Sequence, residues 1–263
     1  MKPWELKLAL LALILVALLA LVFWWRWRIA RREAADHAAD LAKFAAMMGG
    51  TATDVSGDVA AWSAGLLRPF AREYGDVIGW LGRVSDSQFE HALDFERNGW
   101  QVRVTEASIQ LQSPSNADDV NTHYEHRIEV ATADLVPLKL MDRTAGGGEG
   151  ARRWTGEMPR SVADGPHPQW QELRLPAVLE PAFVACTSDL HRAAAMFNPE
   201  VTQRLRAEAA AKDLHSLTLE AGIAYAVLPG QIDPQRLLQE VDAVTGLLER
   251  IPGSRPRNPA AAV

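Results

Sequence analysis

The sequence predicts an α+β protein that has a single N-terminal transmembrane helix and a helical stalk, followed by an antiparallel sheet packed with helices. Three observations predict this class. Residues 8–25 form an apolar run of 18 residues. After Asn98-Gly99, apolar and polar residues alternate, which is the period of a half-buried strand. Between residues 237 and 251, apolar residues recur every three or four positions, as on the buried side of a helix.

The apolar run at residues 8–25 has the length of a membrane span. At about 1.5 Å per residue it reaches roughly 27 Å, close to the roughly 30 Å of a bilayer's hydrocarbon core. Trp4 precedes the run and Trp27 follows it, and indole rings favour the headgroup region. A cleaved signal peptide is the alternative, since Lys2 and Lys7 precede the run. The run is longer than a typical signal core and ends without a small-x-small cleavage pattern, so we expect the lipid bilayer to contact residues 8–25.

The basic residues around this run predict its orientation. Residues 1–7 form a short flank with two lysines, whereas four arginines follow the run: Arg26, Arg28, Arg31 and Arg32. The positive-inside rule then places the soluble domain in the cytoplasm, on a single-pass protein of the bacterial inner membrane.

Charge and cysteine content limit the function classes. The net charge is −6, and residues 1–32 carry six basic and one acidic residue, so the remainder carries −11. So acidic a domain is not expected to bind nucleic acid through a basic face. Cys186 is the single cysteine, which rules out an internal disulfide and multi-cysteine zinc sites. Its apolar neighbours predict a small buried side chain.

Residues 26–48 predict a helical stalk, and residues 49–57 predict a flexible joint that begins with Gly49-Gly50. Apolar stalk residues follow a 4-3-4-3 spacing: Ala34, Ala38, Leu41, Ala45 and Met48. This spacing fits either a coiled-coil seam, and hence a homodimer through the stalk, or a helix packed on its own domain.

Residues 58–97 predict amphipathic helices. Between residues 58 and 81, apolar and aromatic residues recur at intervals of three and four, and Pro69 predicts a kink. We expect this helix to pack on the domain; the alternative is a helix lying on the membrane surface. Ser87-Gln88-Phe89-Glu90 has the form of a capping box and predicts a short helix that ends near Arg97.

Residues 98–252 predict the α+β soluble domain, with a mobile loop at 143–168 and a disordered tail at 253–263. Strands are expected at 100–104, 109–112, 123–131, 138–141, 172–175, 182–187, 216–220 and 223–228, the last two joined at Ala221-Gly222. Helices are expected at 188–197, capped by Thr187 or Ser188, and after Asn198-Pro199-Glu200 and Asp233-Pro234.

Three segments resemble a group of uncharacterised bacterial membrane-anchored proteins with a domain of unknown function. The segments are FVACTSDLHRAAAMFNPEVTQRL, SLTLEAGIAYAVLPG and DPQRLLQEVDAVTGLLERIP. The resemblance is one of pattern and covers residues 172–252. It implies a membrane-tethered α+β domain and carries over no catalytic residues.

No constellation of residues predicts a catalytic, cofactor-binding or metal site. His123 and His126 are expected on one strand at a spacing that turns them to opposite faces, so they cannot chelate one metal. Asp189 and His191 lie at a helix start, where the helix dipole explains the aspartate. The glycine run at 146–150 lacks the form of a phosphate-binding loop.

We therefore expect a non-enzymatic binding or scaffold protein of the bacterial inner membrane, with no cofactor and with a protein or an envelope component as partner. Two alternatives stay open: a membrane-tethered hydrolase with a dispersed acidic site, and a lipid-surface sensor that uses residues 58–81.

Overall fold

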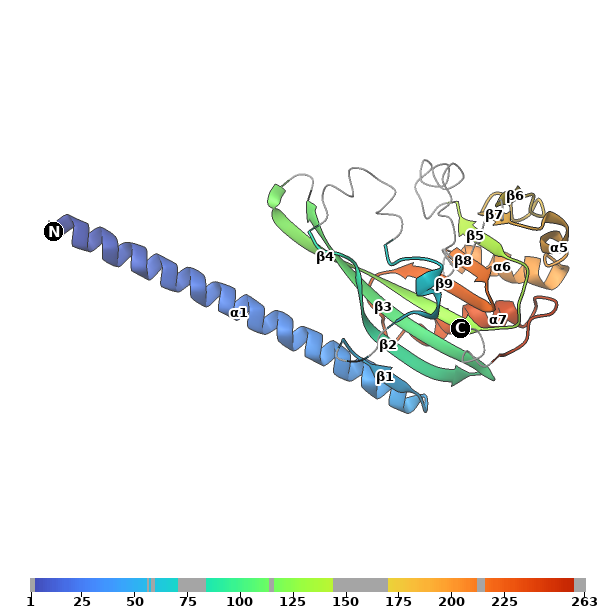
Figure 1. Ribbon diagram of the computed structural model, residues 1–263, viewed down its shortest axis with the longest axis horizontal. Helices are drawn as coiled ribbons and strands as arrows, with labels where there is room; N and C mark the ends of the chain where they lie inside the picture. The colour runs from blue at the N-terminus through green and yellow to red at the C-terminus, as the bar shows by residue number, and fades with distance from the viewer. Residues whose placement is uncertain are drawn as a thin grey trace.

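A computed structural model of the chain describes residues 3–55, 57, 60–70, 84–113, 116–143, 170–211 and 216–257. A long helix, α1 (Pro3–Met47), projects from one end of a sheet domain (Figure 1). The strands of that domain are β1 (Thr51–Thr53), β2 (Gln88–Arg97), β3 (Trp100–Ser113), β4 (Asn116–Ala131), β5 (Leu138–Asp142), β6 (Gln171–Leu173), β7 (Phe183–Thr187), β8 (Ser216–Glu220) and β9 (Ile223–Pro229). Its helices are the 3₁₀ turn η1 (Trp62–Gly65), α5 (Leu190–Ala194), α6 (Pro199–Ala211) and α7 (Leu237–Leu248).

The described strands form one sheet in the order β1-β2-β3-β4-β9-β8-β5-β7-β6. Every pairing between neighbours is antiparallel. The predicted α+β class, with an apolar N-terminal helix and an antiparallel sheet, is confirmed. Both edge strands, β1 and β6, are three residues long, and β1 pairs with residues 92–94 of β2.

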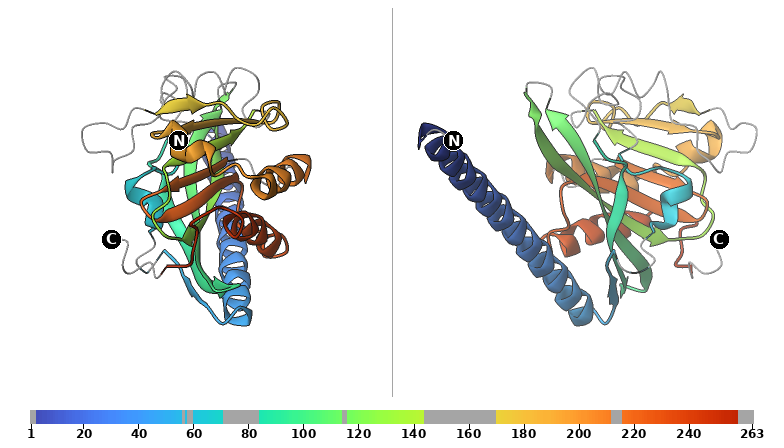
Figure 2. Two further views of the ribbon diagram at one scale, coloured as in Figure 1. Left: turned by 90° about the vertical axis from the view of Figure 1, so that its right-hand side faces the viewer. Right: turned by 60° about the vertical axis from the view of Figure 1, so that its left-hand side comes forward.

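The two faces of the sheet differ in character. One face carries the main hydrophobic core, with Val104, Ile128 and Leu219 fully buried. The end of α1 and helices α6 and α7 contribute to this core, and α6 and α7 lie along the same side of the sheet (Figure 2). The opposite face carries buried charged residues, among them Arg127 and Glu129, and η1 packs against it.

Helix α1 contains both the predicted membrane span and the predicted stalk without a break. Residues 10–36 are exposed, whereas Leu41, Phe44 and Ala45 are buried in the core of the domain. The Phe44 and Phe95 rings meet edge to face at 6.0 Å between centroids. Of the two interpretations of the stalk spacing, these contacts favour the helix packed on its own domain, because Leu41 and Ala45 face the sheet.

The prediction of a flexible joint at residues 49–57 is wrong where the structure describes them. Gly49 has a φ of +69°, and the amide N–H groups of Gly49 and Gly50 donate to the carbonyls of Ala46 and Ala45. This is a Schellman motif, which ends α1 in a fixed geometry. The next residues form β1, which pairs with β2, so the segment is an ordered turn and an edge strand.

The prediction of amphipathic helices at residues 58–97 is also wrong for the described part. Trp62–Gly65 is a single 3₁₀ turn, and Gln88–Arg97 is strand β2. The reason lies in the turn that follows: Asn98 and Gly99 both have positive φ, as a two-residue hairpin requires, so strands must flank the turn on both sides. The capping-box pattern at 87–90 was a weaker signal than this turn. Residues 71–83 lie outside the described residues.

Most later elements match the predictions, with differences mainly in their bounds and in one cap. The strands expected at 100–104 and 109–112 are one strand, β3, and β4 begins at residue 116 instead of 123. The helix expected at 188–197 is the shorter α5, and its cap is Asp189, whose Oδ1 accepts from the Arg192 amide at 3.0 Å. The tail expected at 253–263 is ordered at its start: the Ala133 amide donates to the Arg255 carbonyl, and Pro256 forms a bridge with Thr132.

The predicted cap of α6 and the predicted turn between β8 and β9 are confirmed, whereas α7 begins at Leu237, after Arg236, instead of at Asp233-Pro234. The Asn198 side chain accepts from the Val201 amide at 2.8 Å at the start of α6, and Ala221-Gly222 joins β8 to β9 with both φ angles positive. The predicted mobile loop lies outside the described residues except for Arg143.

Candidate metal centre

A row of titratable side chains crosses the core face of the sheet. His91 on β2 lies directly opposite Glu106 on β3, and Glu106 lies directly opposite His126 on β4. Residues opposite each other in antiparallel strands share one face of the sheet, so all three side chains enter the face that carries the hydrophobic core. Burying such groups is costly unless each has polar partners, which makes the row a candidate site.

Helix α1 supplies a fourth titratable group to this row. His37 lies one helical turn before Leu41, so the packing of Leu41 on the sheet brings His37 over β2 and β3. His37 Nε2 is 3.0 Å from Glu106 Oε2 and 3.3 Å from Oε1. The His37 and His91 rings meet edge to face, with centroids 5.5 Å apart. Helix α1 and two strands therefore converge at one point.

Glu106 is the centre of the cluster. Its side chain is fully buried, and Oε2 accepts a hydrogen bond from the Ile232 amide at 2.6 Å. Among the described residues, its ion-pair partner is His37. His37, His91 and Glu106 each offer one ligand atom, and these atoms all lie within 4.8 Å of one another. Two imidazoles and a carboxylate are a common ligand set of zinc in proteins.

His126, at the far end of the row, has both ring nitrogens engaged. Nδ1 is 3.0 Å from the Gly230 carbonyl, and Nε2 is 3.2 Å from Glu240 Oε2 on α7. These contacts give His126 the role of holding α7 on the sheet. Burial raises the pKa of the neighbouring Tyr124, and the carboxylates of Glu90 and Glu106 raise it further.

A cavity of about 270 Å³ lies beside the cluster, between α1 and the β1 edge of the sheet. Its lining residues are Ala38, Leu41, Ala42, Ala52, Thr53, Asp54, Gly57, His91 and Leu93. Because His91 belongs both to the cavity wall and to the cluster, a small ligand in the cavity reaches the cluster through His91.

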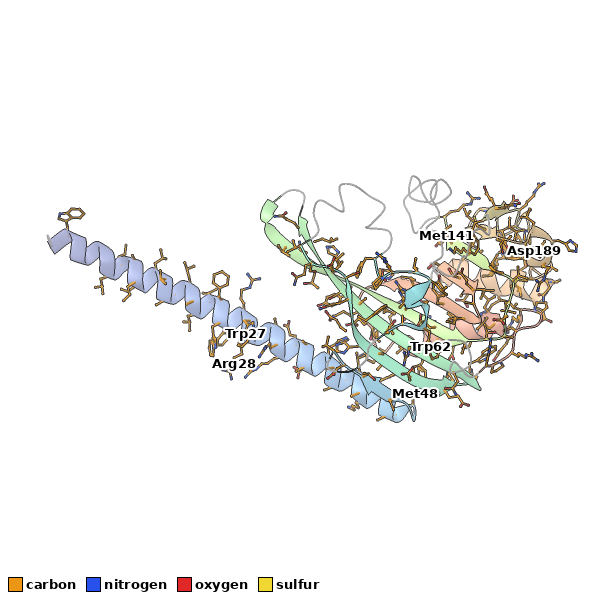
Figure 3. The ribbon with its side chains drawn as sticks, viewed as in Figure 1. Trp27, Arg28, Met48, Trp62, Met141 and Asp189 are labelled. Atoms are coloured by element: carbon orange, nitrogen blue, oxygen red, sulfur yellow. The ribbon has the colours of Figure 1, made fainter. Side chains whose placement is uncertain are left out.

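The buried charges on the opposite face belong to a structural network. Glu129 accepts from the amides of Trp62 and Ser63, each at 2.8 Å, and Arg127 donates to the Leu67 carbonyl at 2.6 Å. Arg127 also pairs with Glu125 at 2.9 Å. Burial raises the pKa of Glu129, although the hydrogen bonds from η1 and the charge of Arg127 oppose the shift. The network fastens η1 to the sheet (Figure 3, Trp62).

Of the residues weighed from the sequence alone, His126 lies directly opposite Glu106 on the buried face, and the others lie apart from the cluster. His123 and His191 are exposed, on β4 and α5, and Asp189 is the cap of α5. Cys186 is fully buried, as predicted, and burial raises its pKa to about 11. The glycine run at 146–150 lies outside the described residues.

Sequence reasoning missed the three clustered residues, although one signal was present. A hairpin centred on Asn98-Gly99 pairs residues whose numbers sum to 197, and His91 and Glu106 are such a pair. Predicting a strand before the turn would have placed these two side by side. The approach of His37 has no counterpart in the sequence, because it depends on how α1 packs on the sheet.

No protein-family model matches the sequence, and no curated protein is similar to it. Among solved structures, the chain is similar to the crystal structure of the mycobacterial trehalose monomycolate transport factor A, TtfA. The identity is 12%, the TM-score is 0.47, and the match covers 84% of this chain and 98% of that chain. A likeness at this level carries no argument about function. The resemblance of residues 172–252 to a bacterial membrane-anchored group stays a prediction.

Proposed function

We propose that the protein is a single-pass, non-enzymatic binding or scaffold protein of the bacterial inner membrane. One observation carries the proposal: α1 is long and apolar enough to cross a bilayer, with a mean hydropathy of 2.2 and no burial in its most apolar stretch, and it continues unbroken into the core of the domain. A signal sequence passes the same hydropathy test. The continuity of α1 with the buried Leu41 and Phe44 supports an anchor that is rigidly joined to its domain.

The side chains at the domain end of the apolar stretch support a membrane boundary there. The Arg28 guanidinium lies 5.3 Å from the centre of the Trp24 ring, and that of Arg31 lies 4.3 Å from the Trp27 ring (Figure 3). Stacked Trp and Arg side chains suit the headgroup region, where an apolar ring and a charge are both solvated. Leu41 lies nine residue steps after Arg32, which is about 14 Å along the helix, so the sheet would lie close to the bilayer surface.

The orientation is tested by fusion of a phosphatase that is active only outside the cytoplasm. We expect a fusion after residue 257 to be inactive, because the arginines that follow the span favour the cytoplasmic side. A fusion before residue 3 is the matched control and should be active. If only the C-terminal fusion is active, the soluble domain lies outside the cytoplasm and the proposed orientation is wrong.

The outer edge of β4 is the surface best suited to a protein partner. Strand β2 pairs with β3 only as far as Ser108, and β9 pairs with β4 only from Glu125 onward. Residues 109–113 and 116–123 therefore form a two-stranded ribbon that extends beyond the rest of the sheet (Figure 1). No described strand pairs with the outer edge of this ribbon, and its residues 120–123 are exposed. An open edge of this kind accepts an extended peptide by strand addition.

A photo-activated cross-linking residue at Asn121 in the full-length protein tests this surface. We expect one dominant cross-linked protein in native membranes, and a strong loss of its yield when Val120 and Thr122 are both replaced by lysine, since edge lysines oppose strand addition. The control site is the exposed Val178, on the far side of the sheet order from β4. Equal cross-linking yields at Asn121 and Val178, or an unchanged yield in the lysine variant, would contradict strand addition at this edge.

Neither alternative function gains support from the described residues. The buried carboxylates of Glu129 and Glu240 each accept hydrogen bonds that hold elements together, which favours structural roles for these two groups over a hydrolytic site. The lipid-sensor hypothesis needs a continuous helix at 58–81, and its described part is a 3₁₀ turn that packs on the sheet.

A further inference from the structure

We propose that His37, His91 and Glu106 bind one divalent transition-metal ion of the zinc class, and that the ion joins α1 to β2 and β3. This inference goes beyond the proposed function and does not depend on it, because metal binding is measured without a partner.

The positions of the donor atoms fit a tetrahedral ion after a small adjustment. Bond lengths of about 2.0–2.2 Å place tetrahedral ligand atoms roughly 3.4 Å apart. The donor atoms of the cluster lie within 4.8 Å of one another, and His37 Nε2 and Glu106 Oε2 are 3.0 Å apart. Moving the most distant donors together requires a shift of roughly 1.5 Å, within reach of side-chain rotation. The His37 side chain is 18% exposed, so it has room for such a rotation.

The chemistry of the donors selects the metal. Two imidazoles and one carboxylate favour zinc and its neighbours over magnesium and calcium, which prefer oxygen ligands. The carboxylate of Glu106 is fully buried, and a bound cation would offset the cost of burying its charge. The Ile232 amide, 2.6 Å from Glu106 Oε2, fixes the orientation of the carboxylate as supporting hydrogen bonds do in metal sites.

The cavity provides the entry path. His91 lines it together with residues of α1 and β1, so an ion arriving through the cavity meets His91 first and Glu106 behind it. Three protein ligands leave at least one coordination position for water or a small ligand from the cavity. His126 is not part of this site, because Gly230 and Glu240 engage both of its ring nitrogens.

Metal binding is tested on the full-length protein in detergent micelles after removal of metals with a chelator. Zn²⁺ is titrated by calorimetry, and Co²⁺ is titrated by visible absorption, whose intensity reports tetrahedral coordination. We expect one equivalent per chain. At a hundredfold excess over the dissociation constant, the melting temperature should rise by about 5–10 °C. Mg²⁺ at the same concentration should leave it unchanged.

Two variants separate metal binding from the hydrogen bond between α1 and Glu106. His37→Gln keeps a side-chain donor toward Glu106 but removes a good zinc ligand, and His91→Ala removes a ligand at the cavity wall. Each should weaken Zn²⁺ binding by at least about 100-fold. The controls are His123→Ala and His191→Ala, which truncate exposed histidines and should bind like the parent protein. The proposal is overturned if the folded parent protein binds no Zn²⁺, if both ligand variants bind as tightly as the parent, or if the controls lose as much affinity.

Discussion

Replacing Phe44 with alanine should release the end of α1 from the domain. Phe44 is 5% exposed and meets Phe95 edge to face at 6.0 Å, so the substitution removes a buried ring and one aromatic pair. Buried Phe to Ala changes cost about 3–5 kcal/mol. Phe44 follows Leu41, which lines the cavity, by about one helical turn, so we expect the lower end of this range. A loss of about 3 kcal/mol raises the population of the undocked helix roughly 150-fold.

Amide hydrogen exchange of the full-length protein in lipid nanodiscs measures this change. Residues 41–48 should exchange roughly 150-fold faster in Phe44→Ala, under conditions where the helix closes faster than it exchanges. Met47→Ala is the matched control, because Met47 is on the same helix and 70% exposed, and its effect should stay within about 0.5 kcal/mol. Unchanged exchange at 41–48 in Phe44→Ala, or an equal effect of Met47→Ala, would refute the docking of α1 through Phe44.

Three further features of the fold are tested by substitution or by chemical modification: the turn after α1, the cap of α6 and the burial of Cys186. Gly50→Ala should cost at least about 3 kcal/mol of unfolding free energy in urea, because the new Cβ would lie 2.1 Å from the Asp94 carbonyl oxygen. In Gly49→Ala the new Cβ meets no atom within 4 Å, so the substitution should cost about 1 kcal/mol because of the positive φ of this residue. A larger loss of unfolding free energy in Gly49→Ala than in Gly50→Ala would contradict the turn geometry. Asn198→Ala should cost about 1 kcal/mol in the same assay through loss of the cap of α6, whereas no loss would contradict the cap. Burial raises the pKa of Cys186 from 9.0 to about 11, so less thiolate is present at pH 8 and alkylation should be roughly 100-fold slower in the folded than in the unfolded protein. Equal rates would place Cys186 outside the core.

Elements whose signal is local could be predicted from the sequence. Asn198-Pro199-Glu200 satisfies the first turn of α6 by itself, and Ala221-Gly222 supplies the positive φ angles that the hairpin of β8 and β9 needs. Residues 87–97 show the limit of such signals. Their spacing fits a helix and a strand, and pairing with β3 decides between the two, so the capping-box pattern was overridden by a tertiary interaction.

The candidate metal centre likewise contains ligands that a local signal places together and one ligand that depends on tertiary packing. The pairing of His91 with Glu106 follows from the turn at Asn98-Gly99, so a strand assigned before that turn would have revealed two of the three ligands. The third, His37, comes from α1, where the 4-3-4-3 spacing predicts that Leu41 and Ala45 lie on the packed side but does not predict which strands that side meets. The packing of Leu41 and Phe44 makes that choice, and it places His37 over Glu106.

In the proposed membrane-anchored protein, the same packing determines how the domain is held relative to the bilayer. A helix of 45 residues is about 68 Å long, and its buried contacts with the domain begin at Leu41. A small rotation about that contact therefore moves the N-terminal end of α1 by a large distance. When that end of α1 is fixed, the same rotation moves the β4 edge instead. The contact of His37 with Glu106 lies one turn closer to the membrane than Leu41, so it restrains this rotation, and a metal ion shared with His91 would restrain it further. On the proposed function, occupancy of the proposed metal centre would then limit the movement of the β4 edge relative to the proposed anchor.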